Sequence, residues 1–212
     1  MVCALKNATG GVLSGKQIRY LIKKKQMLSN YIDLEKQLQT HGFDVTVESV
    51  YKFDPYTHGT LTFEGKTLPN VYEVKTDVTD CWTLNGGTYQ IRLNEIVKLP
   101  KCICAVVLPR SSLIRMGCEL HSALWDAGYE GRGVLLLRVN HPVIIKRNAR
   151  IGQMVFIKLC EKVEHGYDGT YFGEGISKIK AKCNDCGHEF GIAPDDGTVP
   201  CPKCGSSNIS IL

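Results

Sequence analysis

Short apolar runs separated by glycine and proline fill most of the chain between residues 43 and 160, and this pattern constrains the fold more than any other feature. Apolar and polar residues alternate in two stretches, 43–47 and 89–93. A period of two is typical of a strand with one buried face. No long helical period appears in this region. The pattern therefore predicts a mainly β domain, either barrel-like or a jelly-roll variant.

Three longer runs, residues 102–108, 134–139 and 151–157, are almost continuously apolar. Such runs are typical of strands that are buried on both faces. We therefore expect these three segments to lie in the interior, with both faces covered.

A short helix is predicted over residues 13–26. Ser14 and Gln17 have the spacing of a capping box, which satisfies backbone donors at a helix start. An apolar stripe follows at helical spacing, formed by Ile18, Leu21 and Ile22. The lysines after the stripe, 23–25, favour the negative end of the helix dipole, and we expect them to be solvated.

Length and composition bound the kind of protein. A chain of 212 residues can hold one domain with a sizeable core and a small accessory module. Its formal charge of +5 is mild and suits a polyphosphate substrate as well as nucleic acid. No apolar run is long enough to span a membrane, and the N-terminus lacks the apolar core of a signal peptide. We therefore expect an intracellular, cytoplasmic protein.

Four of the ten cysteines form two Cys-x-x-Cys pairs separated by 14 residues. Each pair can present two thiolates to one ion, and four thiolates fit a closed tetrahedral Zn²⁺ site. The predicted structural zinc ligands are Cys183, Cys186, Cys201 and Cys204. We expect the other six cysteines to be small buried apolar residues, namely Cys3, Cys81, Cys102, Cys104, Cys118 and Cys160.

The paired cysteines predict a second module, a zinc ribbon over residues 176–212 that follows a domain over residues 1–175. Its lysines are balanced by an equal number of acidic residues, so the module has no net charge before the thiolates are counted. This balance argues against nucleic-acid binding. We expect the ribbon to support an oligomer or to contact a protein partner.

Two segments carry candidate chemistry. The first, residues 108–117, places Arg110 between a strand-like run and two serines, and arginine can donate in parallel to two phosphate oxygens. The second, residues 124–133, holds Asp126 three residues before Tyr129 in a glycine-rich turn. A carboxylate beside an aromatic ring could orient a water and stack on a sugar or base.

Together these segments resemble the dUTPase and dCTP deaminase superfamily. Gly42-Phe43-Asp44-Val45, Pro109 through Leu113, Asp126 through Gly131, and Ala149 through Phe156 resemble the four motifs of that superfamily, in its order. The Asp-Ala-Gly-Tyr and Asn-Ala-Arg-Ile forms look most like archaeal-type members. The resemblance covers roughly residues 13–160 and implies a dUTPase-like β-clip or jelly-roll barrel.

The resemblance also assigns roles. Asp126 would be the general base for a water that attacks the α-phosphorus, and Asp44 would support the metal side of the site. Tyr129 would stack under the deoxyribose. Backbone groups near Ser122, Ala123 and Leu124 would read the base. The residues placed around the triphosphate are Arg110, Ser111, Ser112 and Gln153, with Arg115 as a second cation nearby.

The activity implied is that of a dUTP pyrophosphatase with Mg²⁺ held mostly by the triphosphate and water. Members of the family are trimers with active sites at subunit interfaces, and we expect a homotrimer here. One alternative is a dCTP deaminase, or a bifunctional dCTP deaminase/dUTPase. Another is a non-catalytic nucleotide sensor or interaction module on the same fold.

One position separates the hydrolase from the deaminase. The deaminases carry a glutamate ten residues after the position of Asp126, and here that position is Leu136. A leucine cannot transfer a proton, so we expect hydrolysis. The chain also lacks the arginine-containing closing segment of common trimeric dUTPases. Residues 166–174 could instead form a lid with Tyr171 or Phe172 against the nucleotide, or a surface loop that leads to the ribbon.

Overall fold

The computed structural model describes residues 10–176, 179–192, 201 and 203–211. The chain separates into two compact units, Met1–Phe172 and Gly173–Leu212. Among the described residues, no helix is long and apolar enough to cross a membrane.

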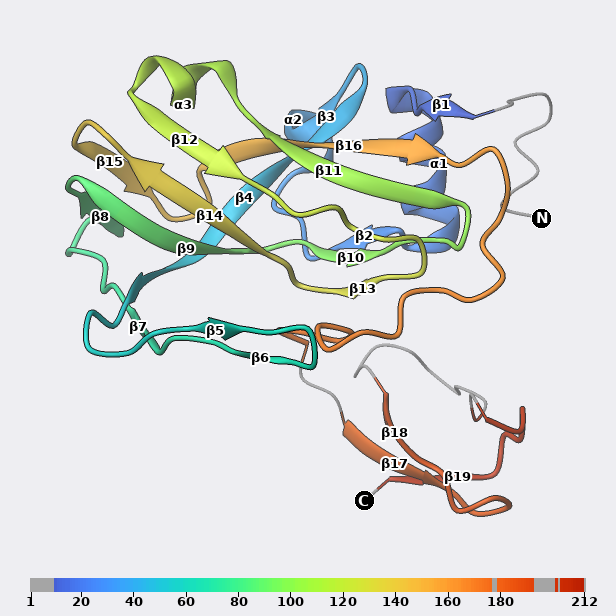
Figure 1. Ribbon diagram of the computed structural model, residues 1–212. Helices are drawn as coiled ribbons and strands as arrows, with labels where there is room; N and C mark the ends of the chain where they lie inside the picture. Colours follow the sequence, from blue (N-terminus) through green and yellow to red (C-terminus); the bar gives the residue numbers. More distant parts are fainter. Residues whose placement is uncertain (1–9, 177–178, 193–200, 202, 212) are drawn as a thin grey trace. The chain divides into compact units, whose positions relative to one another are not determined.

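The first unit is built on an antiparallel nine-stranded sheet, so the mainly β prediction is confirmed (Figure 1). Its main path runs through β1 (Gly11–Val12), β16 (Arg150–Lys158), β4 (Gly42–Phe53), β9 (Gly87–Leu93), β14 (Val134–Val139) and β12 (Cys118–His121). Three further strands join it: β11 (Ile103–Pro109) pairs with β16, and β3 (Leu38–Gln39) and β7 (Val71–Glu73) pair with β4.

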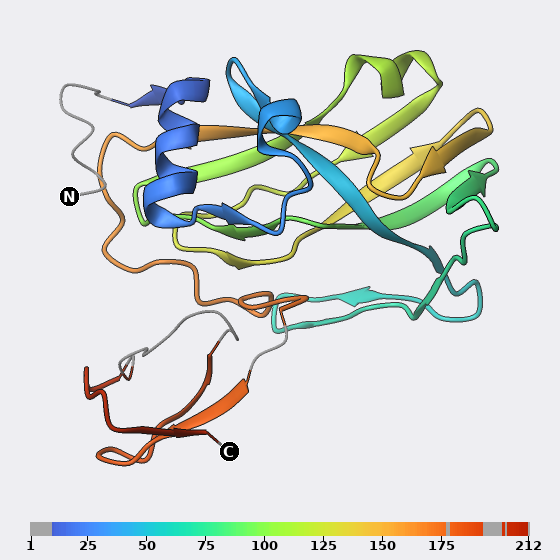
Figure 2. The same cartoon turned by 180° about the vertical axis from the view of Figure 1, so that it is seen from behind.

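The long strand β4 curls the sheet. Its first part pairs with β16, and the part from Val47 onward pairs with β9, with a register shift between Val47 and Ser49. Such a bulge bends a strand and increases its twist. Figures 1 and 2 show β4 crossing from the β16 side of the unit to the β9 side.

Three smaller sheets complete the unit: β2 (Leu28–Ser29), β10 (Ile96–Lys98) and β13 (Glu130–Gly131); β8 (Cys81–Leu84) and β15 (Val143–Lys146); and β5 (Thr60–Leu61) and β6 (Lys66–Thr67). Three helices accompany them: α1 (Gly15–Lys25), α2 (Leu34–Gln37) and α3 (Ser111–Arg115). In both views α1 and α3 lie at opposite ends of the main sheet.

Helix α1 confirms the N-terminal helix prediction. The Gln17 side chain accepts a hydrogen bond from the Ser14 backbone N–H at 2.9 Å. Ile18, Leu21 and Ile22 are buried in the core, and the lysines at 23–25 are exposed.

The prediction that residues 102–108, 134–139 and 151–157 are buried on both faces is confirmed over most of the first run, is only partly right for 151–157, where buried and half-buried residues alternate, and is wrong for 134–139. Leu136 is 36% exposed and Leu108 is 51% exposed, whereas Leu135 and Leu137 are buried. In a single chain β14 covers the core with one face only, as antiparallel strands commonly do, and its outer face stays open.

The prediction for the six cysteines outside the two Cys-x-x-Cys pairs is partly wrong. Cys102, Cys104 and Cys118 are buried, although Cys102 is disulfide-bonded rather than a free thiol. Cys160 is exposed because it follows the end of β16, and Cys81 is half-buried at the first position of the short strand β8. Cys3 lies outside the described residues.

The second unit contains a three-stranded antiparallel sheet, β18 (Glu189–Ile192), β17 (Ile179–Cys183) and β19 (Ile209–Ile211), with β17 in the centre. Cys183 ends the central strand and is buried, as is Cys201. The strands therefore place one cysteine pair beside the other.

Candidate active site and metal centre

Asp44, in the first predicted motif, contacts side chains of the second and fourth motifs. Its Oδ2 lies 3.2 Å from Arg110 Nε and 3.2 Å from Arg150 Nη1, and its Oδ1 accepts from Gln153 Nε2 at 3.4 Å. Strand register explains the meeting, because β16 pairs Gln153 with Leu108 of β11 on one side and with Asp44 of β4 on the other. Arg110 follows the end of β11 and reaches across the β16 strand.

This cluster has an excess of positive charge. Two guanidinium groups share the single carboxylate of Asp44, whose side chain is only 3% exposed. Burial raises the pKa of Asp44, although both arginines and the Gln153 amide act in the opposite direction. The arginine side chains are 30% and 39% exposed, so they can still meet an anion that enters from solvent.

Helix α3 places the two predicted serines beside this cluster. Arg110 is the N-cap residue of the five-residue helix, and Ser111 and Ser112 are exposed at its start. Arg115 is exposed and donates to the Ser111 carbonyl at 3.3 Å. A pocket of about 210 Å³ adjoins them, lined by Arg110, Ser112 and Arg150 together with apolar residues of β15.

Asp126 lies in an exposed turn between β12 and β13. Trp125, directly before it, pairs with Ala105 through two backbone hydrogen bonds of 2.9 and 2.8 Å. Ser122 is held within the turn, where its Oγ accepts from Trp125 Nε1 at 3.1 Å. Ala123 is exposed beside it.

Two strands, β11 and β16, separate the Asp126 turn from Asp44. Asp44 lies on β4, beyond β16, and Trp125 is bridged to the far side of β11 near its start. Along β11, five residue steps separate Ala105 from Arg110, which is about 17 Å at strand spacing. Within one chain the predicted base therefore lies apart from the predicted phosphate ligands.

Tyr129, the predicted sugar platform, is packed into the core with 7% exposure. Its ring lies 5.2 Å from the Trp125 ring and 5.6 Å from the Tyr167 ring. Gly131 permits this position, because a Cβ at residue 131 would come within 2.3 Å of the Tyr129 hydroxyl.

The segment after β16 lies against the Asp126 turn. Tyr167 N donates to the Ala127 carbonyl at 2.9 Å, and Gly166 approaches Gly128 so closely that a Cβ on Gly128 would lie 2.6 Å from the Gly166 Cα. Tyr171 packs further along, under Lys66 Nζ at 4.2 Å from the ring centre. Tyr167 of this segment thus contacts Tyr129. The sequence had not singled out Tyr167.

Leu136 lies on the open outer face of β14, opposite His121 of β12. A groove of about 560 Å³ runs along this face, lined by residues that include His121, Leu136 and Arg138.

The sequence did not reveal that Glu119 lies opposite Arg138. Asn140 Nδ2 donates to Glu119 at 2.7 Å and holds the pKa of that carboxyl below its usual value, so Glu119 is poorly suited to carry a proton at neutral pH.

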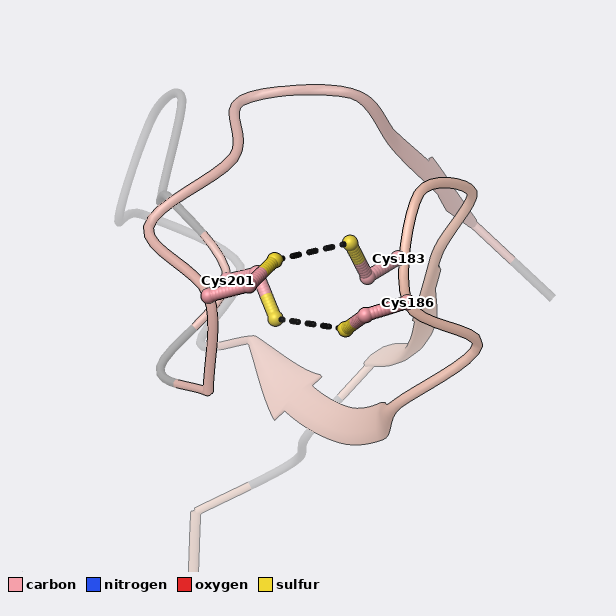
Figure 3. A group of neighbouring side chains, drawn as sticks. Cys183, Cys186 and Cys201 are labelled. Carbon is pink, nitrogen blue, oxygen red and sulfur yellow. Dashed lines mark hydrogen bonds between the residues drawn. The ribbon is translucent and has the colours of Figure 1, made fainter.

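The four paired cysteines of the second unit form the candidate metal centre (Figure 3). Their sulfur atoms all lie within 4.8 Å of one another, with Cys183–Cys204 and Cys186–Cys201 contacts of 3.6 Å. Zinc–sulfur bonds of about 2.3 Å in a tetrahedron place sulfur atoms about 3.8 Å apart, so the cluster fits Zn²⁺.

Both cysteine pairs form the same turn. Gly187 N donates to the Cys183 carbonyl at 2.9 Å, and Gly205 N donates to the Cys201 carbonyl at 2.8 Å. The two glycines have φ values of 70° and 76°, in the left-handed region that glycine adopts without strain. The repeated geometry supports a closed four-thiolate site with no position for a substrate.

Comparison with known proteins identifies the family of this domain. Residues 12–159 match the family model described as dCTP deaminase-like. A probable deoxyuridine 5'-triphosphate nucleotidohydrolase of Archaeoglobus fulgidus is 42% identical over 167 residues, which cover 78% of this chain and 98% of that protein. The deoxyuridine 5'-triphosphate nucleotidohydrolase of Methanocaldococcus jannaschii is 37% identical over 142 residues, which cover 66% of this chain and 89% of that protein.

A solved structure shares the fold. The 2'-deoxycytidine 5'-triphosphate deaminase of Agrobacterium tumefaciens superposes with a TM-score of 0.56 at 23% identity. The match covers 71% of this chain and 50% of that chain.

Proposed function

The chain belongs to the dCTP deaminase-like family, and on that premise we propose that it converts dUTP and water to dUMP and pyrophosphate. The observation that carries the proposal is its 42% identity with the probable deoxyuridine 5'-triphosphate nucleotidohydrolase of Archaeoglobus fulgidus, over 98% of that protein. The cationic cluster around Asp44 supports a polyphosphate substrate independently.

The phosphate chain would bind at the Asp44 cluster. Arg110 has one guanidinium edge on Asp44 and is still 30% exposed, so it can donate to phosphate oxygens. The exposed hydroxyls of Ser111 and Ser112 would add donors at the start of α3. Arg115 and Gln153 would complete the group. Mg²⁺ bound to the triphosphate and water would neutralise part of the phosphate charge.

Asp126 would act on the water. Carboxylates are ionised at neutral pH and can accept a proton as the water oxygen bonds to the α-phosphorus. The bond from the α-phosphorus to the bridging oxygen then breaks, and pyrophosphate leaves with the electron pair. Asp126 is exposed, so a water can reach it without rearrangement of the turn.

Stacking of Tyr129 under the deoxyribose requires movement of the segment after β16. At 7% exposure the ring offers little area to a sugar, and Tyr167 covers part of it. We therefore propose Tyr167, rather than Tyr171, as the aromatic residue that must move when the nucleotide enters. Base reading by the backbone at Ser122 and Ala123 would occur in the same turn.

A complete site would combine two copies of the chain. The separation of Asp126 from the Asp44 cluster within one chain supports a head-to-tail assembly, in which each site takes Asp126 from one copy and Arg110 from another. A closed ring of three such copies is the homotrimer that the family resemblance implies.

The four-cysteine cluster supports a structural Zn²⁺. The equal numbers of lysines and acidic residues in the ribbon favour a protein partner over nucleic acid. A cytoplasmic location stays a prediction.

The deaminase alternative is disfavoured by the apolar Leu136 and by the hydrogen bond that Glu119 accepts from Asn140. A non-catalytic sensor is disfavoured because a binder has no need of an exposed carboxylate at Asp126.

A substrate panel separates these readings. The protein is incubated with Mg²⁺ and each of dUTP, dCTP, dATP, dGTP and dTTP, and pyrophosphate and ammonia are measured. Pyrophosphate from dUTP supports the proposal. Ammonia from dCTP would establish the deaminase, and binding of dUTP without any pyrophosphate would establish the sensor.

A further inference from the structure

Glu95 is a fully buried acidic residue that the proposed reaction does not use. It lies between β9 and β10 with 0% exposure. Buried carboxylates are costly unless they are paired or fully hydrogen-bonded. Each donor to Glu95 among the described residues is neutral, so hydrogen bonds rather than an ion pair satisfy it there.

Three hydrogen bonds converge on the Glu95 carboxylate. Oε2 accepts from the Thr46 backbone N–H at 2.9 Å, and Oε1 accepts from Thr46 Oγ1 at 2.6 Å and from Gln37 Nε2 at 2.7 Å. The Thr46 hydroxyl also accepts from Asn94 Nδ2 at 3.0 Å, so its own proton points to Glu95. The site needs a group that only accepts, which a carboxylate provides and an amide does not.

Gln37 connects Glu95 directly to Asp44. Its Nε2 donates both to Glu95 and to the Asp44 carbonyl, at 2.8 Å. Its Oε1 accepts from the backbone N–H groups of Ile32 and Asp33 at 2.7 and 2.8 Å, which fixes the orientation of the amide. A fully engaged, 1% exposed side chain thus joins the buried carboxylate to the strand that presents Asp44.

A second route leads to the turn before Arg150. Asn94 Nδ2, which donates to Thr46, also donates to Asn148 Oδ1 at 2.9 Å. Asn148 has a φ of 64° in the turn between β15 and β16, two residues before Arg150. The first route thus ends at Asp44, which contacts Arg110. The second ends at the turn directly before Arg150.

We propose that Glu95 is a positioning residue of the phosphate-binding site, which fixes Asp44 through Gln37 and Thr46 and thereby sets the directions of Arg110 and Arg150. The inference rests on the proposed function only in taking this cluster as the site for a polyphosphate. Because Glu95 is fully buried, it would not contact a bound phosphate chain directly. Because Asp126 belongs to a separate turn, loss of the Glu95 contacts weakens polyphosphate binding more than it slows the chemical step.

The test compares four variants of the full chain. Glu95→Gln removes the acceptor-only group, Thr46→Val removes one donor at nearly constant volume, and Thr46→Ser keeps that donor as the conservative rescue. Val50→Ala, on the same strand with 0% exposure and apolar contacts, is the control for a general loss of stability. Melting temperature, KM and kcat for dUTP, and the Kd for inorganic tripolyphosphate with Mg²⁺ are measured for each.

Glu95→Gln and Thr46→Val are expected to raise KM and the tripolyphosphate Kd about tenfold, because a small misplacement of positioning groups has effects of this order or larger. Thr46→Ser and Val50→Ala are expected to stay near wild type in both, although Val50→Ala melts at a lower temperature. If Glu95→Gln does not fold, Thr46→Val decides.

Tripolyphosphate binding in Glu95→Gln and Thr46→Val that is no weaker than in Val50→Ala would overturn the inference. So would wild-type protein that binds no tripolyphosphate. The binding measurement needs no turnover. A wild-type protein that binds tripolyphosphate but does not hydrolyse dUTP would therefore contradict the proposed function and leave the role of Glu95 to be decided by the variants.

Discussion

Arg110 and Asp126 are attached to opposite ends of one strand, β11: Arg110 follows its last residue, and Asp126 follows Trp125, which pairs with Ala105 near its start. The side chain of Arg110 moreover turns away toward Asp44, across β16. A reaction that needs both residues at one phosphorus therefore calls for two copies of the chain.

Mixed oligomers test this arrangement. Arg110→Ala and Asp126→Asn should each be inactive alone. Refolded together in equal amounts, they should recover about a quarter of the wild-type activity, because random head-to-tail assembly leaves that share of sites with both intact residues. Mixing two preparations of Asp126→Asn is the control. Failure to recover activity in oligomers shown to contain both variants would mean that the residues act within one chain.

Replacement of Asp126 separates binding from chemistry. Asp126→Asn keeps the shape of the turn but removes the proton acceptor, so kcat should fall by about 10² to 10⁴-fold. Binding of a non-hydrolysable dUTP analogue, measured by calorimetry, should change little. A variant with wild-type kcat would show that another group activates the water.

The sequence predicts the parts of the site better than their arrangement. The four motifs contain Asp44, Arg110 and Gln153, which the structure brings into contact. Arg150 carried no assigned role, because an arginine at a strand start is ordinarily a solvated residue. Its contact with Asp44 depends on the register of β16 against β4, which no local pattern encodes.

Other features depend on contacts between distant segments. Glu95 follows a strand-like run and has the appearance of a turn residue; its burial depends on donors from residues 37 and 46. The burial of Tyr129 depends on Tyr167, 38 positions later in the sequence. The four-cysteine cluster was predictable because the Cys-x-x-Cys spacing determines the turn that places two thiolates together.

Because Glu95 is buried, its contribution to the stability of the folded chain should decrease as the pH rises. Burial raises the pKa of Glu95, and its hydrogen bonds with Thr46 and Gln37 oppose the shift only in part. The folded chain thus keeps this proton where the unfolded chain, with a glutamate pKa of about 4.3, has lost it. The contribution of Glu95 to the free energy of unfolding is therefore largest below a pH of about 4.3. It declines as the pH rises toward the pKa of Glu95 in the folded chain.

Thermal unfolding of wild type and Glu95→Gln between pH 4 and pH 8 measures this effect. The melting temperature of wild type relative to the variant should decrease as the pH rises above about 4.3. A relative melting temperature that increases over this range would show that the folded state lowers the pKa of Glu95 instead.

Metal analysis tests the ribbon. The purified protein should contain one zinc ion per chain, and Cys204→Ser should lose it, since three thiolates no longer close the tetrahedron. Residues 173–212 should then become sensitive to protease, because so small a module depends on its metal to fold. Cys160→Ser, at an exposed cysteine outside the cluster, is the matched control. Full protease resistance of Cys204→Ser would contradict a structural zinc.

Hydrolysis of dUTP in water enriched in ¹⁸O tests the central claim most directly, with mass spectrometry of both products. Attack of water on the α-phosphorus predicts one ¹⁸O atom in dUMP and none in pyrophosphate, with the two products formed in equal amounts. Label in pyrophosphate would contradict attack at the α-phosphorus, and the absence of both products would contradict the assignment of the chain as a dUTP pyrophosphatase.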